Sequence, residues 1–556
     1  MFFLYSHEKE LVVNNTIQTV ILKSELENTH PIKIVKSDQT IRDSYADYLM
    51  DESKYPDGTA DELVFVYSEN QIVQMIQQAF QSRIPVTISA GRTGIVGGAV
   101  PLGGTLLSLE GMNRFLGARW DEKEKCWFIR FQPGISLKRL QEMLDTNDEI
   151  LQNNSIPFAE ESDKWFYPPD PTEKSAHLGG TVATNASGAR SLKYGQTRKY
   201  INGLRVVLSD GSVISLKRGE NVIGSKKKWT IQNQLRKIEI PVPQYPWPRV
   251  KNTAGYYASN PMDIIDLFIG SEGTLGIITE IEIALRKKPD FIFGGVVFFS
   301  SEKTALHFVQ LTKKMAMATD QPINPTALEY FDDFSLQLLR KKSKLEVSNS
   351  KIPPFPDHAQ AAIYFEQEGK STEIERIYDA YQKILIECHS SIDETWGGFD
   401  QNEQDLMAEF RHSVPEMVNM MVSQRQKRIP NLHKISTDIA VPNKMLNKMI
   451  QIYRHHMDKS GFEYVIFGHI GENHLHVNIL PKDEEEFKKA KDLTIQFSQN
   501  AISMGGTVSG EHGIGKIKKP YFQMMYSREI IQEMQNIKQS LDPRNILGRG
   551  TLFNEC

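Results

Sequence analysis

Short apolar runs alternate with segments of helical spacing along the first half of the chain. Apolar runs at 63–67, 84–88 and 105–109 predict three strands. Residues 70–82 predict the helix between the first two, because their apolar positions lie near helical spacing and Ser68 is a candidate cap. Apolar runs on either side of the polar turn 209–212 predict a hairpin, and one more strand is predicted at 277–285.

The pattern changes after Pro289. Strands predicted at 294–299 and 464–467 alternate there with helices near 302–318, 372–388 and 484–503. We therefore predict an α+β chain with two domains, which agrees with a length of 556 residues. The expected bounds are 1–288 for the first domain, with its core in 56–288, then 289–540 for the second, and 541–556 for a C-terminal tail that returns towards the first.

Composition narrows the functional class. Hydrophobic residues make up 40% and charged residues 24%, as is typical of a soluble globular enzyme, and a net charge of -4 suggests no nucleic-acid partner. Cys126, Cys388 and Cys556 form no CxxC pair, which argues against a cysteine-ligated iron–sulfur cluster and suits a reducing compartment. The apolar run at residues 1–5 is shorter than the apolar core of a signal peptide. We expect a cytoplasmic protein, and peripheral membrane contact stays open.

Three stretches of small residues stand beside the predicted strands. The first, 90–98, holds four glycines in nine residues, and glycine lets backbone N–H groups approach an anion such as a pyrophosphate. Its spacing is that of neither a Rossmann nor a Walker A loop, and a tight turn is the alternative explanation. The second, 179–188, reads as a loop of small side chains that suits a flat ring system. The third, 270–277, leads directly into a strand.

These stretches resemble the FAD-binding domain of the vanillyl-alcohol oxidase / p-cresol methylhydroxylase superfamily. The segments that carry the resemblance are PVTISAGRTGIVGGAVP, DPTEKSAHLGGTVATNASGARSLKYGQTRKYINGLRVVLSDG and LFIGSEGTLGIITEIEIAL. The chain is most similar to the branch of D-lactate dehydrogenases, glycolate oxidase flavoprotein subunits and D-2-hydroxyglutarate dehydrogenases. The resemblance implies a two-lobed FAD-binding domain followed by an α+β C-terminal substrate domain. The FAD contacts that it implies are Gly91, Arg92, Thr93, Gly94, Gly97, Gly98, Gly179, Gly180, Ala183, Asn185, Ala186, Gly188, Glu272, Gly273, Gly276 and Ile277.

The resemblance also bears on how the flavin is held. Relatives with covalent flavin carry a histidine in the first loop, where this chain has Arg92 and Thr93. We therefore expect FAD to be bound non-covalently.

The segment GHIGENHLHVN, residues 468–478, concentrates histidines in a predicted hairpin. Alternation with a period of two puts His474, His476 and Asn478 on one face of its second strand. His469 ends the first strand, across the turn from His476, and two imidazoles so placed can share a metal. A merely polar hairpin face is the alternative.

A second cluster, Glu511 and His512, lies among the glycines of 505–515. The resemblance implies that His469, His476 and Glu511 bind a divalent metal and that His512 is the catalytic base. A Gly-rich loop with incidental charges is the alternative. Relatives usually have Gly-Asn where this chain has Asn473 and His474, so His474 is open as an extra contact or a fourth ligand.

Arg411 and Lys434 are the remaining candidates for the site. Arg411 stands where relatives place an arginine for the substrate, and the guanidinium fork suits a carboxylate. Lys434 precedes the segment STDIAVP, which resembles the strand before a D-x-x-V-P segment in the family. For both residues a solvated surface charge is the alternative.

Together these parts predict the FAD-dependent oxidation of a D-2-hydroxy acid. The metal would lower the pKa of the substrate hydroxyl, His512 would accept its proton, and flavin N5 would accept the C2 hydride. Nitrogen and oxygen ligands suit zinc and also admit manganese or iron. D-lactate is the expected substrate, and D-2-hydroxyglutarate dehydrogenase or a glycolate oxidase flavoprotein subunit are the alternatives.

The electron acceptor is expected to be external, because the sequence has no nicotinamide fingerprint and no cysteine cluster. A quinone, a cytochrome or an electron-transfer flavoprotein would serve. Two further alternatives are a non-redox enzyme like the alkylglycerone-phosphate synthases and a non-catalytic subunit of a glycolate-oxidase-like complex. The Glu-His pair argues against the first, and the retained metal motif argues against the second.

Overall fold

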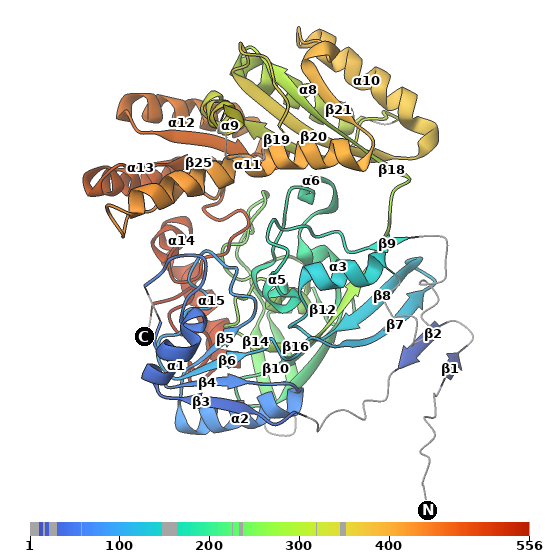
Figure 1. Cartoon of the computed structure of the whole chain (residues 1–556). Helices are drawn as coiled ribbons and strands as arrows, with labels where there is room; N and C mark the ends of the chain where they lie inside the picture. Colours follow the sequence, from blue (N-terminus) through green and yellow to red (C-terminus); the bar gives the residue numbers. More distant parts are fainter. Residues whose placement is uncertain are drawn as a thin grey trace, which may run out of the picture.

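The structure, a computed structural model, describes residues 11–14, 17–21, 30–56, 58–146, 164–224, 226–232, 237–318, 320–344 and 352–554. The apolar run at the N-terminus and Cys556 lie outside these residues. Figure 1 shows a lower lobe, built from the first half of the chain and its C-terminal segment, and an upper lobe built from the residues between them. Among the described residues, no helix is both long and apolar enough to cross a bilayer.

A four-stranded sheet in the lower lobe carries the first predicted elements. Its order is β3-β4-β6-β5, with β4, β6 and β5 parallel and β3 antiparallel to β4. The bounds are β3 Lys33–Lys36, β4 Glu62–Phe65, β5 Val86–Ser89 and β6 Thr105–Ser108, with α1 Asp38–Tyr45 and α2 Glu69–Ser82. The predicted cap of α2 is confirmed, since the Ser68 side chain accepts a hydrogen bond from the Gln71 backbone N–H.

A seven-stranded antiparallel sheet with the order β1-β2-β7-β8-β16-β10-β11 is the larger sheet of the lower lobe. Its strands are β1 Leu11–Asn14, β2 Ile17–Ile21, β7 Phe115–Asp121, β8 Cys126–Phe131, β10 Ile201–Val207, β11 Val213–Lys217 and β16 Ile277–Ala284. The predicted hairpin is confirmed, because β10 and β11 pair across the expected turn. Smaller elements complete the lobe: α3 Leu137–Asp145, β9 Trp165–Phe166, α5 Leu178–Thr184, α6 Ser191–Tyr194, β12 Val222–Ile223, β13 Lys228–Gln232, β14 Lys237–Pro241, β15 Met262–Asp263, α7 Ile265–Phe268 and β17 Arg286–Lys287.

The small-residue stretch 179–188 differs from the predicted loop, because its first part is helix α5. Small side chains serve close packing there. A Cβ on Gly179 would lie 2.5 Å from the Pro133 side chain, and one on Gly188 would lie 1.7 Å from the Asp170 carbonyl oxygen. A composition typical of a loop thus reflects a lack of space around a short helix.

The upper lobe is an eight-stranded sheet with helices on both faces. Its order is β21-β18-β20-β19-β24-β25-β22, with β23 also paired to β25. The strands are β18 Phe291–Phe299, β19 Pro325–Phe331, β20 Ala361–Gly369, β21 Thr395–Gly398, β22 Ile435–Ser436, β23 Ile439–Ala440, β24 Tyr464–Gly468 and β25 His474–Ile479. Helices α8 Glu302–Ala316, α10 Ile374–Glu387, α12 Leu446–Ser460 and α13 Glu484–Ser503 share one core with the sheet, and α9 Asp333–Lys344 and α11 Gln401–Gln426 share a second.

The predicted alternation along β25 is confirmed. Leu475 and Val477 belong to the core with α8, α10, α12 and α13. His474 and His476 therefore lie on the opposite face of the sheet, which is the face that meets the lower lobe.

The C-terminal segment packs in the lower lobe. Helices α14 Lys519–Met525 and α15 Arg528–Leu541 contribute Phe522 and Met534 to its main core, and Leu547 forms a parallel bridge with Val86. Val508 already belongs to that core, so the return to the first lobe begins ahead of residue 541. The expected boundary at 289 falls between β17 and β18.

Candidate active site

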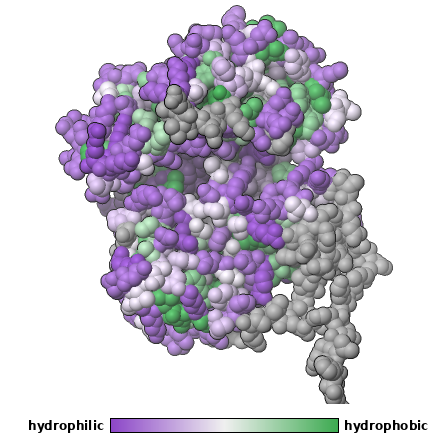
Figure 2. All heavy atoms as spheres, in the orientation of Figure 1, coloured by the Kyte–Doolittle hydropathy of each residue, from purple (hydrophilic) through white to green (hydrophobic). Residues whose placement is uncertain are grey.

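A cavity of about 370 Å³ runs along the three small-residue segments and ends against His469, Glu511 and His512. Figure 2 shows that the molecule is hollowed between the two lobes and that hydrophilic residues line much of the rim. Thirteen of the expected FAD contacts line the cavity: Gly91, Arg92, Thr93, Gly94, Gly98, Gly179, Gly180, Ala183, Ala186, Gly188, Glu272, Gly273 and Gly276. The three segments, far apart in sequence, thus form one wall.

The other three expected FAD contacts, Gly97, Asn185 and Ile277, shape the segments from behind. Gly97 has a φ of +76°, and a Cβ there would lie 3.2 Å from the Tyr55 ring. Asn185 donates to the Gln196 side chain at 3.0 Å and accepts from a backbone N–H. Ile277 is buried in the core of the small sheet.

The cavity wall fits a flavin dinucleotide. A Cβ on Gly98 would meet no heavy atom within 4 Å, so backbone borders open space there. His177, which occupies the N-cap position of α5 and lines the cavity, has a buried Nδ1 without a hydrogen-bond partner among the described residues. Backbone that borders open space and an unpaired polar atom suit the phosphates and heteroatoms of such a ligand. His177 was missed at the sequence level, although it stands within the segment that carries the resemblance.

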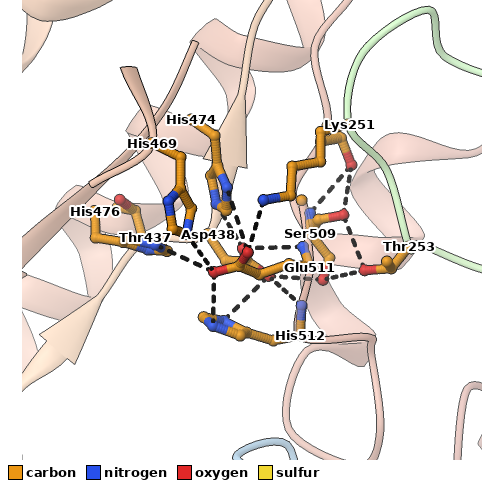
Figure 3. A network of polar contacts seen from close by, with 12 residues as sticks. Lys251, Thr253, Thr437, Asp438, His469, His474, His476, Ser509, Glu511 and His512 are labelled. Atoms are coloured by element: carbon orange, nitrogen blue, oxygen red, sulfur yellow. Dashed lines mark hydrogen bonds and ion pairs between the residues drawn. The ribbon is translucent and has the colours of Figure 1, made fainter. Parts of the chain in front are cut away.

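Glu511 is the centre of the histidine cluster (Figure 3). Its Oε1 lies 3.3 Å from His469 Nε2 and 3.4 Å from His476 Nε2. Two ligands of one tetrahedral ion with bonds of about 2.1 Å lie about 3.4 Å apart, so these separations fit a shared metal. The structure therefore brings the three expected metal ligands together in a donor set that suits a divalent ion.

Oxygen atoms behind the two expected histidine ligands fix their orientation. His469 Nδ1 donates to Glu329 Oε1 at 2.6 Å, and His476 Nδ1 donates to the Thr437 carbonyl at 3.0 Å. Each bond leaves Nε2 directed at Glu511. A second partner of this kind is typical of histidines that bind metals. Burial acts against protonation of His469, but Glu329 and Glu511 raise its pKa to about 9 in the metal-free site.

Asp438 joins the two halves of the cluster, and the sequence analysis assigned it no role. Its Oδ1 accepts from His474 Nε2 at 2.8 Å. Its Oδ2 accepts from Lys518 Nζ at 2.6 Å and from Ser509 Oγ at 2.9 Å. Burial opposes ionisation, but these donors and the nearby His512 hold the pKa of Asp438 well below its usual range.

Lys251 is a second residue that the sequence analysis missed. Its side chain is 1% exposed, and its ammonium lies 2.7 Å from Glu511 Oε2 and 3.1 Å from Glu472 Oε2. Burial lowers the pKa of Lys251, but the two carboxylates outweigh it and raise the pKa above the usual range. Lys251 comes from the lower lobe and Glu472 from the upper, so this cation connects the lobes beside the cluster. Its place in an otherwise polar loop gave no signal in the sequence.

His512, the residue expected to act as the base, faces the cavity. It lines the cavity and its side chain is 24% exposed, whereas His474 is fully buried. Its Nδ1 lies 3.3 Å from Asp438 Oδ2, and its Nε2 lies 3.5 Å from Glu511 Oε1. Burial lowers the pKa of His512, but the Asp438 carboxylate prevails and raises it.

Arg411 and Lys434 have different surroundings. Arg411, on α11, is half-buried and forms no hydrogen bond or ion pair with any residue that the structure describes, yet its charge helps to lower the pKa of Glu329. It is therefore an unpaired cation within electrostatic range of Glu329, the partner of His469, and it is not among the residues that line the cavity. Lys434 instead donates to the Asn419 side chain of α11 at 3.0 Å, and within the described part of the chain no hydrogen bond or ion pair connects it to the cluster.

Comparisons with known proteins agree with this architecture. Residues 60–217 match the family described as FAD binding domain, and residues 296–552 match FAD linked oxidases, C-terminal domain. Glycolate oxidase subunit GlcD of Bacillus subtilis is 27% identical, and the alignment covers 91% of this chain and 92% of that protein. D-lactate dehydrogenase of Anaerostipes hadrus is 27% identical, with the same coverage of 91% and 92%. D-2-hydroxyglutarate dehydrogenase of Stutzerimonas stutzeri is 26% identical and covers 92% and 95%.

Solved structures show the same fold at low identity. The structure of 4-ethylphenol oxidase from Gulosibacter chungangensis has a TM-score of 0.60 at 16% identity and covers 93% of this chain and 94% of its own. An alkyldihydroxyacetonephosphate synthase has a TM-score of 0.59 at 16% identity, with coverage of 95% and 88%. These likenesses confirm the expected α+β architecture. The chain belongs to the FAD-linked oxidases, with an FAD binding domain followed by the C-terminal domain of that family.

Proposed function

We propose that this protein is an FAD-dependent D-2-hydroxy-acid dehydrogenase that oxidises D-lactate to pyruvate. One observation carries the proposal: a single cavity joins the FAD segments to His512, Glu511 and His469. A hydride acceptor and a base must reach the same substrate carbon and its hydroxyl, and this cavity offers room for both. The names of the relatives point to the same substrate class.

We propose that FAD is held without a covalent bond, because the first loop has no histidine. Acid precipitation of the purified protein should release the flavin into the supernatant. Flavin that stays on the washed pellet would contradict this proposal, and His177 would then be the first attachment site to test, because it lines the same cavity.

His469, His476 and Glu511 would hold one divalent ion, with zinc, manganese or iron as candidates. The separations around Glu511 Oε1 support this assignment. Metal analysis of His476→Ala should show that the ion is lost while FAD is retained. Full metal occupancy in that variant would refute the ligand set.

The residues of the chain would then share the work in the reaction. Bound FAD supplies a hydride acceptor, and a bound metal lowers the pKa of a coordinated hydroxyl. His512 Nε2 accepts the hydroxyl proton, and Asp438 holds its ring by Nδ1. Arg411 pairs with the substrate carboxylate, because its guanidinium has no partner among the described residues.

The choice of substrate is tested by anaerobic reduction of the flavin with D-lactate, L-lactate, glycolate and D-2-hydroxyglutarate in parallel. D-lactate should bleach the flavin fastest. If only D-2-hydroxyglutarate or only glycolate bleaches the flavin, the proposed mechanism stands and that compound is the substrate in place of D-lactate. Reduction by L-lactate without D-lactate would overturn the stereochemistry. No reduction by any of the four would favour a non-redox function.

Electrons would leave the reduced flavin for an external acceptor, such as a quinone, a cytochrome or an electron-transfer flavoprotein. We propose that the protein works in the cytoplasm, with peripheral contact to a membrane where the acceptor is a membrane quinone. Reoxidation rates with soluble and vesicle-embedded acceptors would distinguish these cases.

A further inference from the structure

We infer that His474 is a fourth protein ligand of the metal, bound through Nδ1, so that the site consists of three imidazoles and one carboxylate. This inference rests on the metal site of the proposed function and extends its ligand set. It concerns the position at which this chain departs from the Gly-Asn that relatives usually carry.

The hydrogen bonds of His474 decide which of its nitrogens is available. Its Nε2 lies 2.8 Å from Asp438 Oδ1, and the same carboxylate already accepts hydrogen bonds from Lys518 Nζ and Ser509 Oγ, so it acts as the acceptor here too. Nε2 therefore carries the proton, and Nδ1 carries a lone pair. That Nδ1 is buried, has no hydrogen-bond partner among the described residues, and lies 4.0 Å from Glu511 Oε2.

The three histidines thus share one arrangement. In each ring one nitrogen donates to an oxygen of the upper lobe, namely Glu329 for His469, Asp438 for His474 and Thr437 for His476. The other nitrogen faces Glu511 in every case. A carboxylate or carbonyl behind an imidazole is what orients a metal-binding histidine. His474 has this arrangement as completely as the two ligands that the family implies.

Geometry separates His474 from His512. One candidate atom from each of His469, His474, His476 and Glu511 lies within 4.8 Å of all the others, and His512 does not join this group. Two ligands on opposite sides of an ion with bonds of about 2.1 Å lie roughly 4.2 Å apart, and the 4.0 Å between His474 Nδ1 and Glu511 Oε2 is within that limit. His474 is fully buried, whereas His512 faces the cavity, as suits a ligand and a base respectively.

A fourth protein ligand changes which metal fits. Four protein atoms already complete the tetrahedral shell of zinc and leave no position for substrate. A 2-hydroxy acid adds a hydroxyl and a carboxylate oxygen, which makes six ligands in total. Iron(II) and manganese(II) would accept six ligands of this kind more readily than zinc.

The test uses the full chain with FAD, stripped of metal and titrated with Co²⁺, Mn²⁺ and Zn²⁺. His474→Asn installs the residue that relatives usually have, and His455→Asn changes an exposed histidine on α12 as a control. We expect His474→Asn to weaken binding of Co²⁺ and Mn²⁺ by at least tenfold and to change the visible spectrum of bound Co²⁺. The control should change neither.

Unchanged affinity and an unchanged Co²⁺ spectrum in His474→Asn would overturn the fourth ligand and leave the three-ligand site intact. A wild-type protein that binds none of the three ions would instead refute the metal site of the proposed function. If His474→Asn does not fold, X-ray absorption of the Mn²⁺-loaded wild type gives the answer without a variant. Three imidazoles around the ion support the inference, and two contradict it.

Discussion

Replacement of Lys251 by methionine should destabilise the protein much more than the loss of an ordinary ion pair. The substitution keeps the length of the side chain and removes its charge. It would leave Glu511 and Glu472 buried without the cation that now lies 2.7 Å and 3.1 Å from their oxygens. Ser191 Oγ, which lies 3.2 Å from the same ammonium, would lose a partner as well.

The magnitude follows from burial. Removal of one partner from a buried ion pair costs about 3–5 kcal/mol, because the remaining charge has no compensation. With roughly 2 °C per kcal/mol for a large domain, the midpoint of thermal unfolding should fall by at least about 5 °C. Lys489→Met is the matched control, since Lys489 lies 2.6 Å from Glu485 on the exposed face of helix α13. An exposed pair is worth about 0.2–1 kcal/mol, so the control should scarcely shift the midpoint.

The assay is thermal unfolding of both variants and the wild type with FAD and a metal chelator, at pH 7 and low salt. Addition of the metal should recover part of the loss in Lys251→Met, because a cation at Glu511 replaces part of the missing charge. A shift in Lys251→Met as small as that in Lys489→Met would refute the reasoning. It would mean that Glu511 and Glu472 become hydrated or protonated with little loss in the free energy of unfolding.

Three further predictions concern the site. His512→Asn should retain the metal and lower kcat by roughly 10²–10⁴, measured by anaerobic flavin reduction beside metal analysis, and loss of the metal would make His512 a ligand instead. Arg411→Lys should raise KM for a 2-hydroxy acid about tenfold or more, because an ammonium cannot form the paired bonds of a guanidinium, and an unchanged KM would exclude Arg411 from the substrate. Glu272→Gln should flatten the pH dependence of stability in FAD-free protein. Burial raises the pKa of Glu272 to about 7, although backbone N–H groups of Ile514 and Gly515 oppose it. The folded state thus binds more protons than the unfolded state between about pH 4.5 and 7. The free energy of unfolding of the wild type should therefore decrease by at most about 3 kcal/mol as the pH rises from 4.5 to 7. An equal decrease in the variant would contradict this assignment.

Local patterns sufficed for much of the fold and for the placement of several site residues. Alternation along β25 placed His474 and His476 on one face, and helical spacing with Ser68 located α2. These predictions depend only on neighbours in the chain. The helical start of 179–188 was not predictable in this way, since its small residues are required by close contacts with Pro133 and Asp170, which are distant in sequence.

Lys251 and Asp438 could not be predicted from the sequence for the same reason. Lys251 and Glu511 are 260 positions apart, and no local pattern marks either as the partner of the other. Asp438 stands in a short segment between β22 and β23, where an aspartate is unremarkable by composition. Its importance comes from donors on three other segments, including Lys518 and His474. Only tertiary structure brings such groups together.

The return of the C-terminal segment to the lower lobe determines when the protein can mature during synthesis. The backbone N–H of Val86 donates to the carbonyl of Ile546, and Gly548 N–H donates back to Val86. Strand β5, which leads into the first glycine segment, therefore obtains these partners only after residues 546–548 have left the ribosome. The main core of the upper lobe lies within residues 293–504, so it can form before residues 546–548 emerge. Nascent chains should thus carry a finished upper lobe beside an open cofactor lobe, and shortened chains that end before residue 546 should accumulate without flavin.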